Sequence, residues 1–173
     1  MKKQDISENL AKLAYLAIGS NLGNKINNIE IAKLELKKYD IIILKSSSYY
    51  ISESWPDPSK PNFINIVIKI KTDLEPVELL RICNQIELKL GRVRRRVYAP
   101  RTCDIDIIDF NMMILNTFNK QLILPHPIMN KRNFVLLPLF EIEKSWKHPI
   151  SRNSIVKLIN SLSVKDLRSI KQI

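Results

Sequence analysis

The 173-residue chain carries 28 Lys and Arg against 17 Asp and Glu, a formal net charge of +11 with both histidines neutral. Its 45% apolar and 26% charged residues are typical of a folded globular protein and exclude a disordered or fibrous one. The longest apolar run, Phe134 to Phe140, is far shorter than the roughly 20 residues that cross a bilayer, so no membrane is expected as a partner.

The length predicts one domain, residues 13–173, after a polar leader of residues 1–12. This leader is followed by no apolar run long enough for a signal-peptide core, so the expected location is the cytoplasm. Cys83 and Cys103 lie 20 residues apart without CxxC spacing, which favours reduced core thiols over a disulfide or a zinc site.

The distribution of arginine is more informative than the total charge. Lysine outnumbers arginine 19 to 9, so the overall basicity is weak support for a nucleic-acid partner. Five of the nine arginines, however, lie within residues 92–101, with no acidic residue among them. That basic loop indicates either a local anion site or a local nucleic-acid patch, although loops of this charge are most often only solvated.

The first half of the chain predicts the element order βαββα. Residues 13–18 form an apolar run typical of a covered strand, and Gly19 to Gly23 then make a tight turn into a helix over residues 24–39. A second strand is expected over residues 41–51. A proline-rich loop follows over residues 55–61, because proline lacks the backbone N–H donor that strands and helices need.

Residues 63–71 give the most regular strand pattern, with isoleucines at every second position. Thr72 and Glu75 have capping-box spacing and predict the start of a helix that ends at Gly91. The remaining elements expected are a strand, a hairpin turn with its return strand, and two helices, over residues 102–113, 116–120, 122–124, 130–142 and 154–162. This order predicts an α+β fold, a ferredoxin-like α/β sandwich with a mixed, mainly antiparallel sheet covered by helices.

Asp104 and Asp106 are the first candidates for chemistry. They stand at i and i+2 on a predicted strand, so both carboxylates leave one face while Ile105 and Ile107 enter the core. Paired carboxylates suit magnesium, which takes one or two of them together with phosphate oxygens. Two solvated aspartates would be the more common explanation of the spacing alone, but the nearby arginines favour a magnesium polyphosphate site. Asp109 has the opposite parity and is not expected to be a third ligand.

Two other features are weaker when taken alone. Phe63 and Asn65 share the face of their strand that lies away from the isoleucines, and an aromatic ring with an amide could stack on and hydrogen-bond a flat heterocycle. Half-buried strands often show the same residue types. His126, between two prolines and ahead of Arg132, could donate to an anion, although a lone histidine is more often structural.

Taken together in chain order, these motifs resemble the 6-hydroxymethyl-7,8-dihydropterin pyrophosphokinase family, over about residues 14–162. The resemblance is carried by AIGSNLG, FIN, IE followed by GRVR, PRTCDID, PH, and RNF running into PLFEI, at residues 17–23, 63–65, 86–94, 100–106, 125–126 and 132–142. It implies transfer of pyrophosphate from ATP to the hydroxymethyl group of the pterin, with release of AMP, in folate biosynthesis.

The resemblance also implies roles for individual residues. Asp104 and Asp106 match the pair that holds two Mg²⁺ ions, and with Arg92 and Arg101 they match the catalytic residues. The residues matching the ATP site are Asn84, Glu87, Arg94, Ile107, His126 and Arg132. The residues matching the pterin site are Ser52, Glu53, Trp55, Phe63, Asn65, Tyr98 and Phe134. The expected ligands are therefore ATP and the pterin. The chain is expected to be a monomer and to bind no nucleic acid.

Several positions depart from the family pattern. Asn84 stands where a Gln commonly meets adenine, and Gln121 and Ile123 replace an Arg and a Thr on the ATP side. Residues 52–55 replace a Thr-Pro-rich stretch near the pterin. Two other functions stay open at this point: a ferredoxin-like RNA-binding module that uses the basic loop, and an inactive relative kept as a scaffold. The RNA-binding alternative lacks the glycine-and-aromatic motif of such modules, and its carboxylate pair would repel phosphate.

Overall fold

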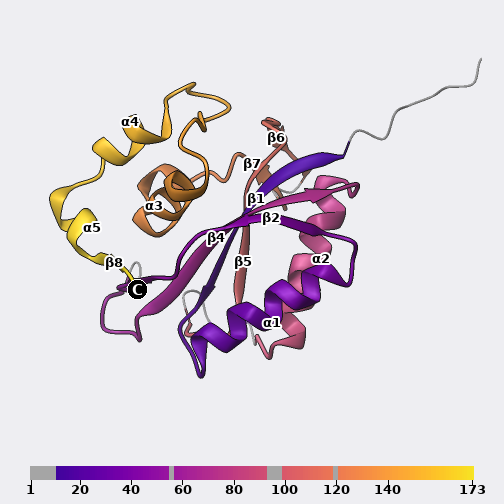
Figure 1. The fold of residues 1–173 in the computed structure, drawn as a ribbon, viewed down its shortest axis with the longest axis horizontal. Coiled ribbons are helices and arrows are strands. Elements are labelled where there is room, and N and C mark those ends of the chain that lie inside the picture. The colour runs from indigo at the N-terminus through magenta and orange to yellow at the C-terminus, as the bar shows by residue number, and fades with distance from the viewer. Residues whose placement is uncertain (1–10, 55–56, 93–98, 119–120) are drawn as a thin grey trace, which may run out of the picture.

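The computed structural model of the chain describes residues 11–54, 57–92, 99–118 and 121–173, and an antiparallel sheet lies at its centre (Figure 1). The strand order in the sheet is β5 (Asp104–Phe110), β1 (Lys12–Ser20), β4 (Phe63–Thr72), β3 (Tyr50–Ser52) and β8 (Ile170–Gln172), with β2 (Ile42–Ser46) also paired to β4. Along the chain, α1 (Lys25–Lys37) follows β1 and α2 (Pro76–Lys89) follows β4. With β2 and β3 counted as one interrupted strand, the order is βαββαβ, which confirms the predicted α+β, ferredoxin-like class.

Alternation along the central strands gives the sheet two apolar faces, and helices cover both (Figure 1). Ile66 and Ile68 of β4 pack on one face against Leu36 of α1 and Ile82 of α2. On the other face Val67 packs against α3 (Asn133–Ile142) and α4 (Ile155–Asn160). The expected division of residues 63–71 between two faces is therefore confirmed, and residues facing α3 at the end of the sheet are free to line a site.

The expected strand over residues 41–51 is divided into β2 and β3. Ser46 pairs with Ile68 but Tyr50 pairs with Asn65, so the segment from β2 to β3 advances four residues while β4 advances three. Ser47 fills the irregular position, because its hydroxyl accepts a hydrogen bond from the Val67 amide at 3.0 Å. A local pattern of apolar residues cannot reveal such a bulge.

The expected capping box between Thr72 and Glu75 is wrong. Thr72 ends β4, and its hydroxyl accepts from the Leu74 amide at 3.2 Å, whereas Glu75 is the cap residue and makes no side-chain cap bond. α2 instead starts at Pro76, whose fixed φ suits the first helical position. Its other end agrees with expectation, since Gly91 closes it with a positive φ of 83°.

The second half of the chain contains the expected hairpin, β6 (Leu115–Asn116) with β7 (Ile123–Leu124). The helix expected over residues 130–142 consists of a short 3₁₀ turn, η2 (Met129–Lys131), an extended Arg132 and then α3. After α4 the structure has two elements that the sequence analysis did not predict, α5 (Val164–Arg168) and β8. α5 has no buried residue, so it lacks the apolar stripe by which helices are found.

Glu143, just after α3, ties this helix to the sheet. Its carboxylate accepts from Lys69 Nζ of β4 and from Ser145 Oγ, each at 2.7 Å, and the Lys69 bond is the main cause that lowers the Glu143 pKa from 4.5 to about 2. Because the folded-state pKa is the lower one, the stabilisation is present above about pH 4.5 and is lost as pH falls through 2.

We therefore expect Glu143→Gln to lower the free energy of unfolding by about 1–2 kcal/mol at pH 7 and by less than about 0.5 kcal/mol at pH 2. Denaturant titrations of both proteins at the two pH values measure this difference. A loss that is the same at both pH values would contradict the ion-pair explanation.

Candidate active site

The predicted carboxylate pair lies at the start of β5, beside the ends of two neighbouring strands. Asp104 pairs with Gly19 of β1, and Gly19 pairs in turn with Asn65 of β4, while Asp106 pairs with Ala17. Both aspartates therefore share the face of the sheet that α3 covers. As expected from the parity, Ile105 enters the opposite core.

Asp109 does not follow the parity expected from the sequence. Ile107 pairs with Leu16 and Asp109 pairs with Tyr15, so Ile108 is an extra residue and shifts Asp109 to the face of Asp106. Asp109 is nevertheless only 1% exposed and accepts from Trp146 Nε1 at 2.9 Å, and it lines a different pocket. The conclusion that it is no third ligand of the pair therefore holds for a different reason.

Three arginines from different parts of the chain converge on the two aspartates. Arg92, which follows α2, and Arg101, which precedes β5, donate to the two carboxylate oxygens of Asp104. Arg132, which precedes α3, donates through Nη1 to Asp106 Oδ2 at 2.7 Å. The arrangement places fixed positive charge around a diacid at the edge of an open pocket.

Two of these guanidinium groups have a buried donor without a hydrogen-bond partner. Nε of Arg101 and Nε of Arg132 are the buried side-chain nitrogens and oxygens of the described residues that lack one. A buried donor of a charged group that remains unpaired costs free energy, on the order of 1–3 kcal/mol or more. Donors of this kind suit an anionic acceptor such as a phosphate oxygen.

Glu87 of α2 lies beneath the arginines and is only 3% exposed. Its carboxylate accepts from the Ile105 amide at 2.7 Å and from Arg92, so it fixes both the start of β5 and one guanidinium group. Burial raises the Glu87 pKa to about 7. The structure thus joins Glu87 to the carboxylate pair through Arg92.

His126 and Arg132 lie together beside Asp106. His126 Nδ1 accepts from the Ile128 amide at 3.3 Å, which leaves Nε2 facing Arg132 Nη1 at 3.3 Å and Asp106 Oδ2 at 3.8 Å. Burial lowers the His126 pKa, so the imidazole is mainly neutral at pH 7.

Five of the seven residues expected at the pterin site line one pocket: Ser52, Glu53, Phe63, Asn65 and Phe134. Asn65 Nδ2 donates to Ser52 Oγ at 3.0 Å, which fixes the orientation of the amide in the pocket wall. The Arg101 guanidinium lies 5.1 Å from the Phe63 ring centre and that of Arg132 lies 5.6 Å from the Phe134 ring centre. The pocket therefore has two aromatic rings and a buried amide next to the diacid. The residues that line it are Ala17, Ile18, Gly19, Ser52, Glu53, Phe63, Asn65, Arg101, Asp104, Asp106, Arg132 and Phe134.

Other expected site residues are not brought to this pocket. Asn84 is half-buried on α2, three residues before Glu87, and Ile107 packs in the core on the opposite face from Asp106. Trp55, Arg94 and Tyr98 lie outside the described residues.

Sequence reasoning missed the part that Asn21 plays. The side-chain oxygen Oδ1 of Asn21 accepts a hydrogen bond from the backbone amide of Arg101 at 2.7 Å, and the backbone amide of Asn21 donates to the Arg101 carbonyl at 3.1 Å. The side-chain nitrogen Nδ2 of Asn21 donates to the Pro61 carbonyl at 3.2 Å. This buried residue therefore ties Arg101, which lines the pocket, to Pro61 in the loop before β4. The sequence predicts a turn at GSNLG and includes this stretch in the family resemblance, but no local pattern indicates that Asn21 binds the backbone of two distant segments.

Comparisons with known proteins agree with the motifs. The sequence model of the family described as 7,8-dihydro-6-hydroxymethylpterin-pyrophosphokinase (HPPK) matches residues 15–144. The chain is 40% identical over 141 residues to the 2-amino-4-hydroxy-6-hydroxymethyldihydropteridine pyrophosphokinase of Aquifex aeolicus, covering 82% of this chain and 86% of that protein. It is 41% identical over 131 residues to the protein of the same name from Bacillus subtilis, covering 75% and 77%.

Longer relatives and solved structures match over part of their length. The folic acid synthesis protein of Dictyostelium discoideum is 42% identical over 139 residues, which are 79% of this chain and 20% of that protein. A crystal structure of Plasmodium falciparum HPPK-DHPS superposes with a TM-score of 0.72 at 16% identity, over 99% of this chain and 49% of that one. The structural similarity supports the fold, whereas the assignment to a family rests on the sequence relatives and the family model.

Proposed function

The chain belongs to the 7,8-dihydro-6-hydroxymethylpterin-pyrophosphokinase family, and we propose that the pocket beside Asp104 and Asp106 is its active site. The activity is transfer of pyrophosphate from ATP to 6-hydroxymethyl-7,8-dihydropterin, which gives AMP and the pterin diphosphate in folate biosynthesis. The observation that carries the assignment of the site is the convergence of three guanidinium groups on a carboxylate pair, next to a pocket with two aromatic rings and a buried amide.

Mg²⁺ suits the donors that the site offers. Asp104 and Asp106 supply hard oxygen ligands from one face of β5, and we propose that they hold two ions together with the ATP phosphates. Among the described residues no group of three or more His, Cys, Asp and Glu side chains could form a closed metal cage, which agrees with a metal that takes phosphate and water oxygens. When bound, the metal neutralises phosphate charge and polarises the phosphoryl oxygens.

The arginines bind and activate the transferred group in this proposal. In the ligand-free protein Arg92 and Arg101 are compensated by Asp104, and Arg132 is compensated by Asp106. When the triphosphate binds, each guanidinium group can exchange a carboxylate oxygen for a phosphate oxygen, so no buried charge is left unpaired. The unpaired Nε atoms of Arg101 and Arg132 supply two further donors.

The substrate itself provides the nucleophile, which is the hydroxyl of the pterin hydroxymethyl group. Its oxygen forms a bond to the β-phosphorus of ATP, the bond from that phosphorus to the α,β-bridging oxygen breaks, AMP leaves with the bridging oxygen, and the hydroxyl proton passes to solvent. The protein aligns the two substrates, since Phe63 and Phe134 can stack on the pterin ring while Asn65 hydrogen-bonds its edge. We propose that ATP binding also involves Glu87, His126, Asn84 and Ile107. Pterin binding also involves Ser52 and Glu53.

The nucleotide product provides the direct test. The chain is incubated with Mg²⁺, ATP and 6-hydroxymethyl-7,8-dihydropterin, and the nucleotides are separated by chromatography. AMP formed in equal amount to the pterin diphosphate is the expected result, and omission of the pterin should prevent it. Formation of ADP, or of no nucleotide product, would contradict the proposed reaction.

Gly19 permits the close packing of the pterin wall. A Cβ atom at this position would lie 2.8 Å from Asn65 Oδ1 and 3.3 Å from Phe63 Cδ1. We expect Gly19→Ala to push the Asn65 amide out of place and weaken pterin binding about tenfold, at a cost of about 1 kcal/mol in stability. Calorimetric titration with the pterin and a non-hydrolysable ATP analogue measures this. Ala14→Gly, on the same strand but in the core and outside the pocket lining, is the control. Unchanged pterin affinity would show that the amide is not a ligand.

We also propose that residues 13–173 act as one monomeric domain in the cytoplasm. Strands β1 to β5 and β8 share one sheet, which is consistent with a single domain. In the part of the chain that the structure describes, every helix is too short or too polar to span a bilayer.

A further inference from the structure

The α5 and β8 elements make contacts with two walls of the pocket. They form residues 163–173 and lie beyond residues 15–144, which the family model matches. We propose that this 163–173 segment is a positioning element that holds the pterin end of the pocket in its binding geometry. The proposal rests on the proposed function, because it takes this end of the pocket to be the pterin site.

The first contact is between β8 and β3. Ser52, at the end of β3, pairs with Ile170, and beyond it the Glu53 amide donates to the Ser169 carbonyl at 3.3 Å. β3 has only three residues, and without β8 it would be an edge strand held by β4 alone. The segment thus fixes the strand end that places Ser52 and Glu53 in the pocket wall.

The second contact is between the segment and the first turn of α3. Asn133 is 8% exposed, and its amide donates to the Asp166 carbonyl and, at 3.0 Å, to Ser169 Oγ. Asn133 stands between Arg132 and Phe134, which both line the pocket. Arg132 is held separately by its ion pair with Asp106. Holding the Asn133 side chain therefore chiefly fixes the direction in which Phe134 leaves the backbone.

Ser169 joins the two walls in one residue. Its carbonyl accepts from Glu53 and its hydroxyl accepts from Asn133, so the distance between the β3 end and the α3 start is set through a single backbone unit. A second tie between the walls, from Tyr50 Oη to Glu141 at 2.9 Å, joins β3 to the distant end of α3 and cannot set the position of Phe134.

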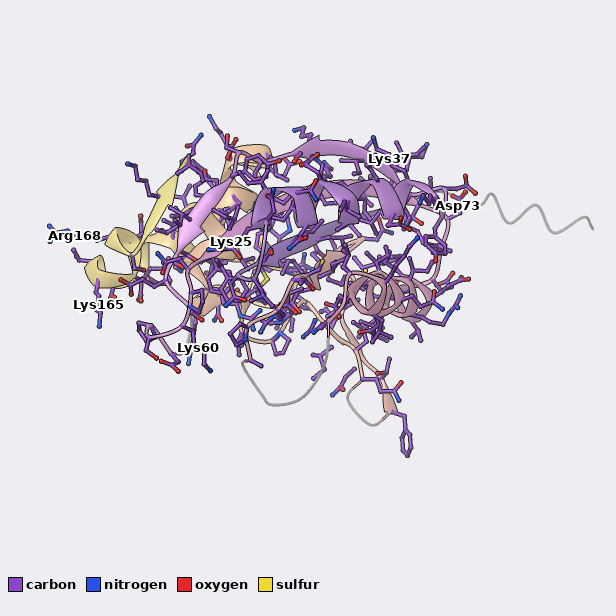
Figure 2. The ribbon with its side chains drawn as sticks, turned by 90° about the horizontal axis from the view of Figure 1, so that it is seen from below. Lys25, Lys37, Lys60, Asp73, Lys165 and Arg168 are labelled. Atoms are coloured by element: carbon purple, nitrogen blue, oxygen red, sulfur yellow. The ribbon has the colours of Figure 1, made fainter. Side chains whose placement is uncertain are left out.

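The 163–173 segment adds little to the apolar core. Its effect on the position of the pocket walls can therefore be distinguished from an effect on the stability of the whole fold. α5 has no buried residue, and its charged side chains Lys165 and Arg168 project outward at the end of the molecule (Figure 2). α3 is anchored independently by Val135 and Leu136 in the apolar cluster under the sheet. Loss of the segment should therefore disturb the pterin end without unfolding the rest.

The test compares pterin affinity with nucleotide affinity in four variants of the full chain. One variant ends after Arg168 and lacks β8, the second is Ser169→Ala, the third is Ser169→Thr, which keeps the hydroxyl, and the fourth is Ser154→Ala. Ser154 caps α4 through a bond from the Lys157 amide, away from the pocket, so this variant is the control for removal of a hydrogen-bonded serine hydroxyl. Calorimetry gives Kd for the pterin and for a non-hydrolysable ATP analogue with Mg²⁺, and circular dichroism reports folding.

We expect the pterin Kd to rise about tenfold or more in the truncated chain and about threefold in Ser169→Ala, while the analogue Kd changes less than about twofold. Ser169→Thr and Ser154→Ala should bind pterin within about twofold of the unmodified chain. Unchanged pterin affinity in both the truncation and Ser169→Ala would overturn the proposal, as would parallel losses for pterin and analogue. If the truncated chain fails to fold, the Ala and Thr variants of Ser169 decide.

A further variant, Phe134→Ala, separates this proposal from the assignment of the pocket. If it leaves pterin affinity unchanged, the pocket is not the pterin site, and both proposals fail. If it weakens pterin binding while the changes at Ser169 and the truncation do not, only the positioning proposal is wrong.

Discussion

Asp106→Asn is expected to reduce AMP formation at least about a thousandfold while the chain stays folded. The substitution keeps the shape of the side chain but removes the negative charge that the proposed magnesium site needs. The side chain of Asp106 is 34% exposed and its ion pair is with Arg132, so losing the charge should cost no more than about 1 kcal/mol of stability. A large loss of turnover in a stable protein is therefore the signature of a chemical role.

Asp109→Asn is a matched control on the same strand. Its carboxylate accepts from Trp146 and from the Met112 amide in a buried site away from the pocket. We expect this variant to lose about 1–2 kcal/mol of stability but to keep turnover within a few fold. Steady-state AMP formation at saturating Mg²⁺, with thermal unfolding of each variant, makes the comparison. Turnover of Asp106→Asn within tenfold of the unmodified chain would refute the assignment of the carboxylate pair.

The parts of the fold that sequence predicted are those with local causes. The isoleucines at every second position of β4 lie on the face that packs against α1 and α2, and Gly91 is favoured where α2 ends because its φ is positive. The misplaced start of α2 has a local cause too. The Thr72 hydroxyl accepts a hydrogen bond from the nearby Leu74 amide instead of capping the helix. The helix starts at Pro76, which the capping-box pattern does not take into account.

Features that depend on pairing between distant residues could not be predicted. The bulge at Ile108 exists because β5 must match the register of β1, and nothing within residues 104–110 indicates it. β8 is a strand only because it meets the edge of β3, and α5 shows no apolar stripe. Both therefore required the structure.

The features of the candidate site also fall into those predictable from local sequence and those that depend on contacts between distant residues. Alternation alone predicted that Asp104 and Asp106 share a face, which the register confirms. The pairing of Arg132 with Asp106, 26 residues apart, and the clamp of Asn21 on Arg101, 80 residues apart, depend on how the sheet and α3 assemble. Family resemblance supplied Arg132, Asp106 and Arg101 as candidates but not Asn21, and it gave no physical reason for their positions.

The second large effect expected is at Arg101, where alanine should lower kcat about 10²–10⁴-fold and change the affinity for an ATP analogue less than about fivefold. In the free protein Arg101 is already compensated by Asp104, so binding the ground-state triphosphate exchanges one anionic partner for another and gains little affinity. Charge that develops on the transferred group in the transition state has no equivalent in the free protein, so the loss falls on kcat.

Measurement of kcat, KM and the Kd of the analogue for Arg101→Ala and Arg101→Lys gives the division between binding and chemistry. Lysine keeps the charge but loses the paired donors and the contact with the Phe63 ring, so it should recover only part of kcat. Arg81→Ala is the control, because Arg81 is exposed on α2 and its ion-pair partner Glu78 lies 3.9 Å away at the surface. Equal losses in kcat and in analogue affinity for Arg101→Ala would mean that this guanidinium binds substrate and transition state alike.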